Sequence, residues 1–168
     1  MNALPPAAIT RIGVGTDLHR LESGKPLLLG GVRVPHTHGL IGHSDADVVL
    51  HAVADALLGA AGLPDIGEQF PDTDPVHAGA DSGELLQRVA ALVALKGFAV
   101  AYVDLVIQAE RPRLVGHKPA IRDRIARLLS IVPQRVNVKA KTNEGVDAIG
   151  RGEAIGCIAV AGLSSTAG

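Results

Sequence analysis

Apolar residues recur with helical spacing in three stretches of the chain. The stretches are residues 44–61, 81–97 and 119–130. The first opens with an S-x-x-D pattern formed by Ser44 and Asp47, which is typical of a helix N-terminus, and ends near Gly62. Gly97 and Pro133 close the other two stretches. The pattern therefore predicts three helices.

Further stretches have the composition and alternation of β-strands. They are residues 11–15, 27–29, 32–34, 98–108, 135–141 and 154–163. Gly30 and Gly31 separate the second stretch from the third, as a tight turn does. The last stretch is almost entirely apolar, which favours a strand buried on both faces. The order of elements indicates an α+β fold, a mixed β-sheet with helices packed on one face, whose other face suggests oligomerisation.

Composition and charge narrow the classes of function. Residues 1–10 are rich in Ala and Pro and are expected to form a loose tail, and residues 11–168 suit one domain. The net charge of −1 argues against a nucleic-acid-binding surface. No stretch is apolar for long enough to span a membrane, and no signal peptide is recognisable, so the expected location is the cytoplasm.

Asp17, His19 and His51 are candidate metal ligands. Asp17 and His19 follow the first predicted strand at a spacing of two, which turns both side chains to the same side of an extended chain. His51 lies in an apolar helix, where its imidazole needs a partner or a metal. Two histidines and a carboxylate leave one position open, as in catalytic zinc sites. The alternative is a capping Asp, a surface His and a core His with ordinary hydrogen bonds.

Asp47 and Asp55 share a predicted helix face with His51, and either carboxylate could accept a hydrogen bond from its ring. Without a metal, a solvated polar stripe is the better interpretation. His43 and Ser44 stand at the helix N-terminus, which favours an anion, although Ser44 alone is more simply an N-cap.

The loops carry further polar candidates. Residues 64–80 form a long loop in which Asp65-Ile66-Gly67 and Phe70-Pro71-Asp72-Thr73-Asp74 could bind sugar or polyol hydroxyls, although ordinary turn chemistry is favoured locally. Basic side chains that could contact phosphate also occur, although each one singly is more simply solvated. They are Arg111, Arg113, Lys139, Lys141 and Arg151.

The motifs become specific when their order is considered. In chain order they are Gly15-Thr16-Asp17-Leu18-His19, His43-Ser44-Asp45-Ala46-Asp47, His51, Asp65-Ile66-Gly67, Phe70-Pro71-Asp72-Thr73-Asp74, Gly79-Ala80-Asp81-Ser82, Val136-Asn137-Val138-Lys139-Ala140 and Gly150-Arg151-Gly152-Glu153. With these motifs, residues 11–163 resemble the 2-C-methyl-D-erythritol 2,4-cyclodiphosphate synthase family.

The resemblance implies a phosphorus–oxygen lyase of the non-mevalonate isoprenoid pathway, with residues 11–168 as its single catalytic domain. Its substrate would be 4-diphosphocytidyl-2-C-methyl-D-erythritol 2-phosphate, and its products the cyclic diphosphate and CMP. It further implies a homotrimer of α+β subunits with their sheets toward the trimer axis and with active sites shared between neighbours.

The resemblance also implies roles for individual residues. Asp17, His19 and His51 would bind Zn²⁺ or another divalent metal, and Glu144 would contact Mg²⁺ or Mn²⁺ on the substrate diphosphate. His43 and Thr142 would be catalytic. The substrate-binding positions would be Ser44, Asp65, Ile66, Gly67, Phe70, Pro71, Asp72, Thr73, Asp74, Ala109, Arg113, Leu114, Val115, Ala140, Lys141, Asn143 and Arg151.

Two other hypotheses use the same residues. A zinc-dependent phosphohydrolase would use the triad with water as the nucleophile and release inorganic phosphate. A trimeric module that binds a metal or an isoprenoid phosphate would catalyse nothing, but it has no need of both an open metal position and Glu144. Ala148 stands where many members of the resembled family carry an aromatic residue that lines a cavity on the trimer axis, so the resemblance does not extend to isoprenoid diphosphate binding in that cavity.

Overall fold

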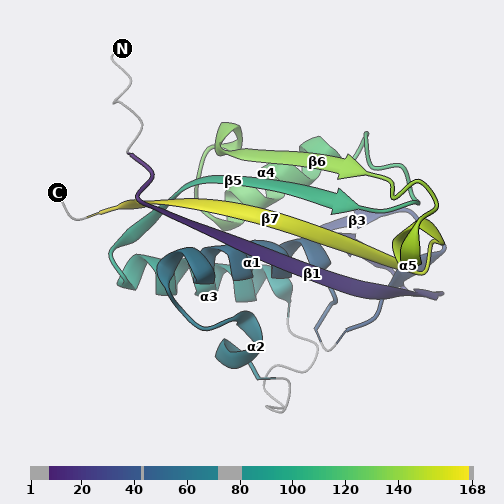
Figure 1. Ribbon diagram of the computed structural model, residues 1–168, viewed down its shortest axis with the longest axis horizontal. Helices are drawn as coiled ribbons and strands as arrows, with labels where there is room; N and C mark the ends of the chain where they lie inside the picture. Colours follow the sequence, from purple (N-terminus) through teal and green to yellow (C-terminus); the bar gives the residue numbers. More distant parts are fainter. Residues whose placement is uncertain (1–7, 43, 72–80, 167–168) are drawn as a thin grey trace.

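The computed structural model describes residues 8–42, 44–71 and 81–166, and within these ranges the protein is a mixed β-sheet covered by helices (Figure 1). The main sheet has five strands in the order β4-β1-β7-β5-β6. Their bounds are β1 Arg11–Ser23, β4 His38–Leu40, β5 Phe98–Gln108, β6 Val136–Lys141 and β7 Ala154–Ser165. The α+β class and the mixed sheet are confirmed.

Long antiparallel ladders form the centre of the sheet. β7 pairs with β1 from Arg11↔Leu163 to Arg20↔Ala154, and on its other side it pairs antiparallel with β5. β6 is parallel to β5, which requires the crossover through helix α4, Lys118–Leu128. The ends of β1, β5 and β6 and the start of β7 therefore meet at one end of the sheet, at the right of Figure 1.

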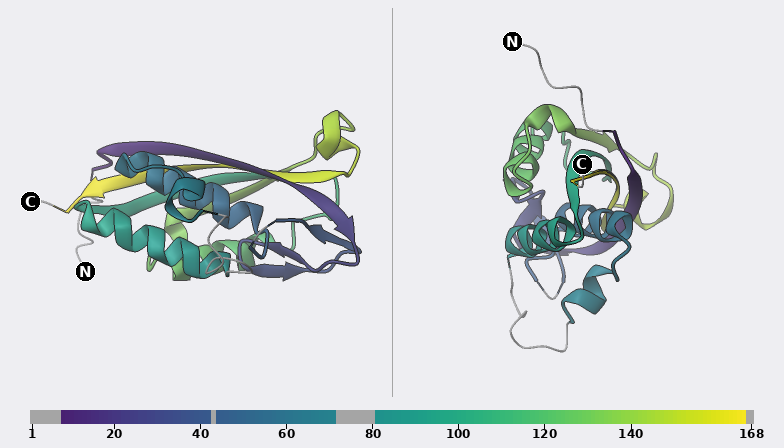
Figure 2. Two further views of the ribbon diagram at one scale, coloured as in Figure 1. Left: turned by 90° about the horizontal axis from the view of Figure 1, so that it is seen from below. Right: turned by 90° about the vertical axis from the view of Figure 1, so that its left-hand side faces the viewer.

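The helices cover one face, as predicted. Helices α1 (Val48–Ala61), α3 (Ser82–Leu95) and α4 lie on the same side of the strands (Figure 2). Gly13 and Gly15 let α1 approach β1 closely, because a Cβ on Gly15 would lie 2.1 Å from the Ala52 carbonyl oxygen. This contact between α1 and β1 fixes the position of the metal-site candidates.

The opposite face of the sheet is apolar and exposed. Its outward side chains include Ile12, Val14, Leu18, Ile158 and Val160. Val14 is 63% exposed, and its cross-strand neighbour Val160 is 40% exposed. The expectation that residues 154–163 are buried on both faces is therefore wrong for this chain taken alone.

The loop before α1 is anchored by Asp47 and not by Ser44. Strands β2 (Leu27–Leu29) and β3 (Val32–Val34) form the predicted hairpin, with positive φ angles of 63° and 71° at Gly30 and Gly31. Asp47 is fully buried and accepts hydrogen bonds from both glycine N–H groups and from Val49 and Leu50. The predicted S-x-x-D cap is wrong, because Asp47 is itself the N-cap of α1.

Hydrophobic periodicity does not predict the short elements or all of the element boundaries. β1 extends to Ser23, well beyond residues 11–15, because most of its later residues are polar and the hydrophobic pattern therefore does not mark them as a strand. Helices α2 (Ile66–Gln69) and α5 (Asp147–Gly150), η2 (Pro133–Arg135) and strand β4 occupy segments expected as loops or as parts of other elements. None of the described helices is long and apolar enough to cross a membrane.

Candidate metal centre and active site

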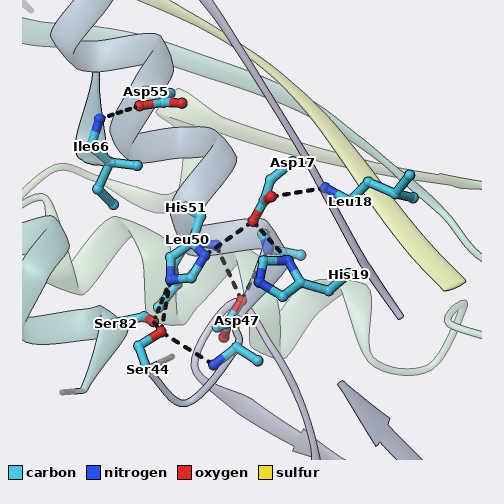
Figure 3. A network of polar contacts seen from close by, with 12 residues as sticks. Asp17, Leu18, His19, Ser44, Asp47, Leu50, His51, Asp55, Ile66 and Ser82 are labelled. Atoms are coloured by element: carbon cyan, nitrogen blue, oxygen red, sulfur yellow. Dashed lines mark hydrogen bonds and ion pairs between the residues drawn. The ribbon is translucent and has the colours of Figure 1, made fainter. Parts of the chain in front are cut away.

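Strand β1 and helix α1 bring the three candidate metal ligands together. Asp17 and His19 lie within β1, not after it, and both turn toward α1, which carries His51 (Figure 3). All three side chains are largely buried, with 24%, 16% and 15% of their surface exposed, respectively. The predicted shared side of Asp17 and His19 is confirmed, because residues i and i+2 of a strand face the same way.

The geometry of the cluster fits one ion. Asp17 Oδ2 lies 3.0 Å from His19 Nδ1 and 3.0 Å from His51 Nδ1. Each of the three residues offers one potential ligand atom, and these atoms lie within 4.8 Å of one another. Asp17 Oδ1 is already engaged by the Leu18 N–H at 2.8 Å. Ligands about a tetrahedral zinc ion are separated by about 3.3 Å, so little movement would be needed.

His19 supplies the observation that favours a metal. Its Nδ1 atom is buried and has no hydrogen-bond partner among the described residues, although Asp17 Oδ2 is close. A buried polar atom without a partner is costly, and a cation at the point where the three atoms converge would satisfy it. The donor set is also right, because imidazole nitrogen and carboxylate oxygen are common ligands of zinc.

Electrostatics lead to the same conclusion. Burial by itself would raise the pKa of Asp17, but the facing His19 and His51 rings lower it to about 2. Burial by itself would lower the pKa of His51, but the hydrogen bond and charge of Asp17 raise it above its usual value. The cluster thus favours positive charge beside an ionised Asp17, and a divalent cation supplies that charge.

The outer side of the His51 ring contacts two serines. His51 Nε2 lies 2.9 Å from Ser82 Oγ and 3.1 Å from Ser44 Oγ (Figure 3). The expectation that Asp47 or Asp55 accepts from this ring is wrong. Asp47 caps α1, and Asp55 accepts the Ile66 N–H at 2.8 Å.

The Asp55 contact brings the predicted polyol-binding loop toward the triad. Ile66 begins α2, whose N-cap Asp65 accepts the Glu68 N–H at 2.9 Å. Asp55 lies one helical turn after His51, so Asp65, Ile66 and Gly67 lie near the metal site. Phe70 and Pro71 follow directly, whereas His43 and Asp72, Thr73 and Asp74 lie outside the described residues.

A second group of candidates gathers at the ends of β5 and β6. Ala109 N–H donates to the Lys141 carbonyl oxygen at 2.9 Å, which places the predicted substrate-binding positions that follow β5 beside those at the end of β6. Ala109 and Leu114 are buried, whereas Val115 is 73% exposed and Arg113 is exposed. Ala140 is half-buried at the end of β6.

The loop after β6 presents the remaining candidates. Thr142 Oγ1 donates to Glu144 Oε1 at 3.0 Å, and Asn143 Nδ2 donates to Asp147 at 2.9 Å. Arg151 is exposed and pairs with Glu153 at 2.8 Å, so its guanidinium already has a partner. Each of these side chains is placed beside another polar group of its own loop.

The two groups of candidates do not converge within one chain. β6 is three strands away from β1 in the sheet, and a spacing of about 4.8 Å between strands puts Thr142 roughly 14 Å from the triad. Among the described residues, Asp17, His19 and His51 form a group of potential metal ligands, and Glu144 is not part of that group.

Sequence reasoning gave no role to Asp45 and Ser82. Ser82 is 1% exposed, and its hydroxyl donates to Asp45 Oδ1 while its Oγ atom faces His51. Both residues lie within quoted motifs, but a contact across 37 positions leaves no periodic signal in the sequence.

The chain belongs to the YgbB family, whose model matches residues 10–164. The chain, with its mixed sheet and its cluster of Asp17, His19 and His51, is therefore a protein of the YgbB class. Relatives carry the name 2-C-methyl-D-erythritol 2,4-cyclodiphosphate synthase. One from Pelobacter propionicus is 54% identical over 89% of this chain and 95% of its own length, and one from Bordetella avium is 52% identical over 94% and 97%.

Solved structures agree with the fold. A 2C-methyl-D-erythritol-2,4-cyclodiphosphate synthase in a CDP-bound form superposes with a TM-score of 0.85 at 41% identity, covering 92% of this chain and all of its own. The CDP complex of IspF from Plasmodium falciparum gives 0.81 at 32% identity, covering 92% and 96%. The resemblance expected from the motifs is therefore confirmed.

Proposed function

We propose that the triad and a neighbouring chain's residues 109–115 and 140–142, which would bind cytidine, form an active site that cyclises a diphosphocytidyl substrate. The chain has the activity of its family, a phosphorus–oxygen lyase reaction of the isoprenoid pathway that forms 2-C-methyl-D-erythritol 2,4-cyclodiphosphate. The convergence of Asp17 Oδ2, His19 Nδ1 and His51 Nδ1 is the observation that supports metal assistance.

The reaction needs little covalent chemistry from the protein. The substrate, 4-diphosphocytidyl-2-C-methyl-D-erythritol 2-phosphate, carries its own ionised nucleophile. An oxygen of the 2-phosphate bonds to the β-phosphorus, the bond from that phosphorus to the bridging oxygen breaks, and CMP leaves with the electron pair. Catalysis is therefore mainly positioning and neutralisation of charge.

Different residues would carry out the positioning and the neutralisation of charge. Asp17, His19 and His51 would hold Zn²⁺ or another divalent ion, and Glu144 would hold Mg²⁺ or Mn²⁺ at the diphosphate. These ions supply Lewis acidity to the phosphate oxygens. Thr142 would turn its hydroxyl from Glu144 to a phosphate oxygen, and the loop at Asp65 would bind polyol hydroxyls. The catalytic role of His43 and the substrate contacts of residues 72–74 stay predictions.

A cytidine-containing substrate is supported by the CDP bound to two structural neighbours. Binding of the base would fall to residues 109–115 and 140–142, where aliphatic walls and backbone groups replace aromatic rings. Arg113 and Lys141 are exposed and would meet the phosphates. To contact the substrate, Asn143 would have to release its hydrogen bond to Asp147, and Arg151 would have to release its ion pair with Glu153.

A homotrimer with the sheets toward its axis accounts for two features at once. It would cover the exposed apolar face around Val14 and Val160, and it would let one chain's Thr142 and Glu144 approach another chain's triad. A cytoplasmic location also stays a prediction, to be tested by cell fractionation.

Phosphorus NMR of the purified protein with the substrate, zinc and magnesium tests the function. CMP should appear together with a cyclic diphosphate, and both should be lost on chelation. CMP with a linear product or inorganic phosphate would favour the phosphohydrolase. A folded, metal-loaded protein that gives no product would favour the binding module.

A further inference from the structure

Buried Ser82 and half-buried Asp45 form a connection behind the His51 ring. The Ser82 N–H donates to Asp45 Oδ2 at 3.1 Å, and the Ser82 hydroxyl donates to Asp45 Oδ1. Ser82 Oγ also lies 2.9 Å from His51 Nε2 (Figure 3). The turn before α1, helix α1 itself and the first turn of α3 are thereby joined at one point beside the triad.

The direction of each hydrogen bond follows from the groups present. The Ser82 hydroxyl has a single hydrogen, and it donates this hydrogen to Asp45 Oδ1. Ser82 Oγ can then only accept from His51, which requires the hydrogen of the ring to be on Nε2. In the neutral ring the lone pair therefore lies on Nδ1, the atom that faces Asp17.

We propose that Asp45 and Ser82 are positioning residues, which hold His51 in the tautomer and orientation that present the Nδ1 lone pair to the metal. The proposal rests on the metal site of the proposed function. Ser82 acts through His51, and Asp45 acts through Ser82. Acceptors for the free N–H of a metal-bound histidine fix its ring in this way.

Ser44 does not replace Ser82 in this role. Its Oγ atom is farther from His51 Nε2, at 3.1 Å, and also accepts the Ala46 N–H at 3.3 Å. No carboxylate fixes its hydroxyl hydrogen among the described contacts, since its other near neighbour is Ser82 Oγ at 3.3 Å. The tautomer is thus set through Ser82.

The same contacts also hold the start of α3 against the turn before α1, so the test must separate the two effects. Ser82→Ala removes the hydroxyl but keeps the backbone bond to Asp45. Asp81→Ala is the matched control, because Asp81 caps the same helix by accepting from Gly83 and Glu84 and does not contact His51. It should weaken α3 without altering the ring.

Metal binding is measured directly, with Co²⁺ followed by visible absorption and Zn²⁺ by competition with a chelator. We expect Ser82→Ala to bind both ions about 10- to 100-fold more weakly than the unmodified protein, and Asp81→Ala to bind them equally well. Nitrogen-15 NMR of the zinc-loaded protein should show Nδ1 of His51 bound to metal and Nε2 protonated. In Ser82→Ala the Nε2 signal should lose its hydrogen-bonded character.

Asp45→Ala provides an independent variant if Ser82→Ala does not fold. Without its acceptor, the Ser82 hydroxyl is free to donate to His51 Nε2, which favours the opposite tautomer and again weakens metal binding. Unchanged metal affinity in either folded variant would overturn the proposal, as would an equal loss in Asp81→Ala. If the unmodified protein itself binds no metal, the proposed metal site is wrong. If the unmodified protein and the variants bind metal equally well, only the positioning role of Asp45 and Ser82 is wrong.

Discussion

At the scale of single residues, His51 is the triad member contributed by a helix, and its removal tests the metal assignment. We expect His51→Ala to abolish turnover and to lower the zinc content, because a carboxylate and one imidazole cannot retain the ion. The ring is not part of the apolar core, so circular dichroism should show an unchanged fold. Zinc content is measured by elemental analysis.

His38→Ala is the matched control for that variant. His38 lies in β4 and contacts Thr37 Oγ1 at 2.9 Å, outside the triad. It should keep both zinc and activity. Full activity in metal-free His51→Ala would show that the triad is not a catalytic metal site.

Asp47 holds the hairpin β2–β3 against the start of α1. Asp47→Ala leaves four backbone N–H groups without their acceptor, two in the turn and two in the helix. We expect the free energy of unfolding to fall by about 3 kcal/mol or more, and by less in Asp47→Asn, which keeps one oxygen. Urea denaturation measures both. Equal stability of Asp47→Ala and the unmodified protein would refute this role.

At the scale of elements, helices and strands with a strong hydrophobic period were predictable, and their junctions were not. The apolar runs located α1, α3, α4, β5 and β7 within a few residues of their observed bounds. The N-cap of α1 was misassigned because Ser44 and Asp47 both suit a cap, and only the fold shows that Ser44 turns to His51. Pairing across many residues cannot be read from local spacing.

The closeness of α1 to β1 keeps His51 within reach of Asp17 and His19. A Cβ on Gly15 would lie 2.1 Å from the Ala52 carbonyl oxygen, so Gly15→Ala must displace the helix. We expect a loss of stability of about 1–3 kcal/mol or more, together with weaker zinc binding. Chemical denaturation and zinc titration are the two measurements.

Gly59→Ala is the control within the same helix. A Cβ there meets its nearest neighbour, the Val14 carbonyl oxygen, at 3.8 Å, which is ordinary contact. Because Ala favours a helix over Gly, this variant should gain about 0.5–1 kcal/mol and bind zinc normally. Unaltered zinc affinity in Gly15→Ala would mean that the metal site does not depend on this close packing.

At the scale of the whole molecule, the triad could be predicted because it combines two residues spaced i and i+2 in one strand with a single histidine in an apolar helix. The rest of the site could not be assembled from periodicity. Thr142 and Glu144 follow a strand at the edge of the sheet, far from β1 in one chain, and only the family resemblance assigned them to the same reaction. In the proposed assembly, contacts between chains would bring them together, and no pattern within one chain specifies such contacts.

The exposed pair Val14 and Val160 tests the proposed assembly. Val160→Asp places a charge on the apolar face and should give an inactive monomer with a native circular dichroism spectrum. Val132→Asp changes a valine that is 55% exposed outside the sheet and should leave the oligomer intact. Analytical ultracentrifugation measures the assembly. An active Val160→Asp monomer would contradict a site shared between chains.

Mixing two inactive variants tests sharing of the site without disturbing the interface. His51→Ala lacks a functional triad, and Thr142→Ala lacks the hydroxyl at the end of β6, so neither should turn over alone. If each site takes its triad from one chain and its Thr142 from a neighbour, co-refolded mixtures contain intact sites. When equal amounts of the two variants assemble at random, half of the chains carry an intact triad and half carry Thr142. A site needs one contribution from each kind of chain, so about a quarter of the sites are complete. Recovery of about a quarter of the unmodified activity is expected, whereas no recovery in mixed oligomers would place the whole site within one chain.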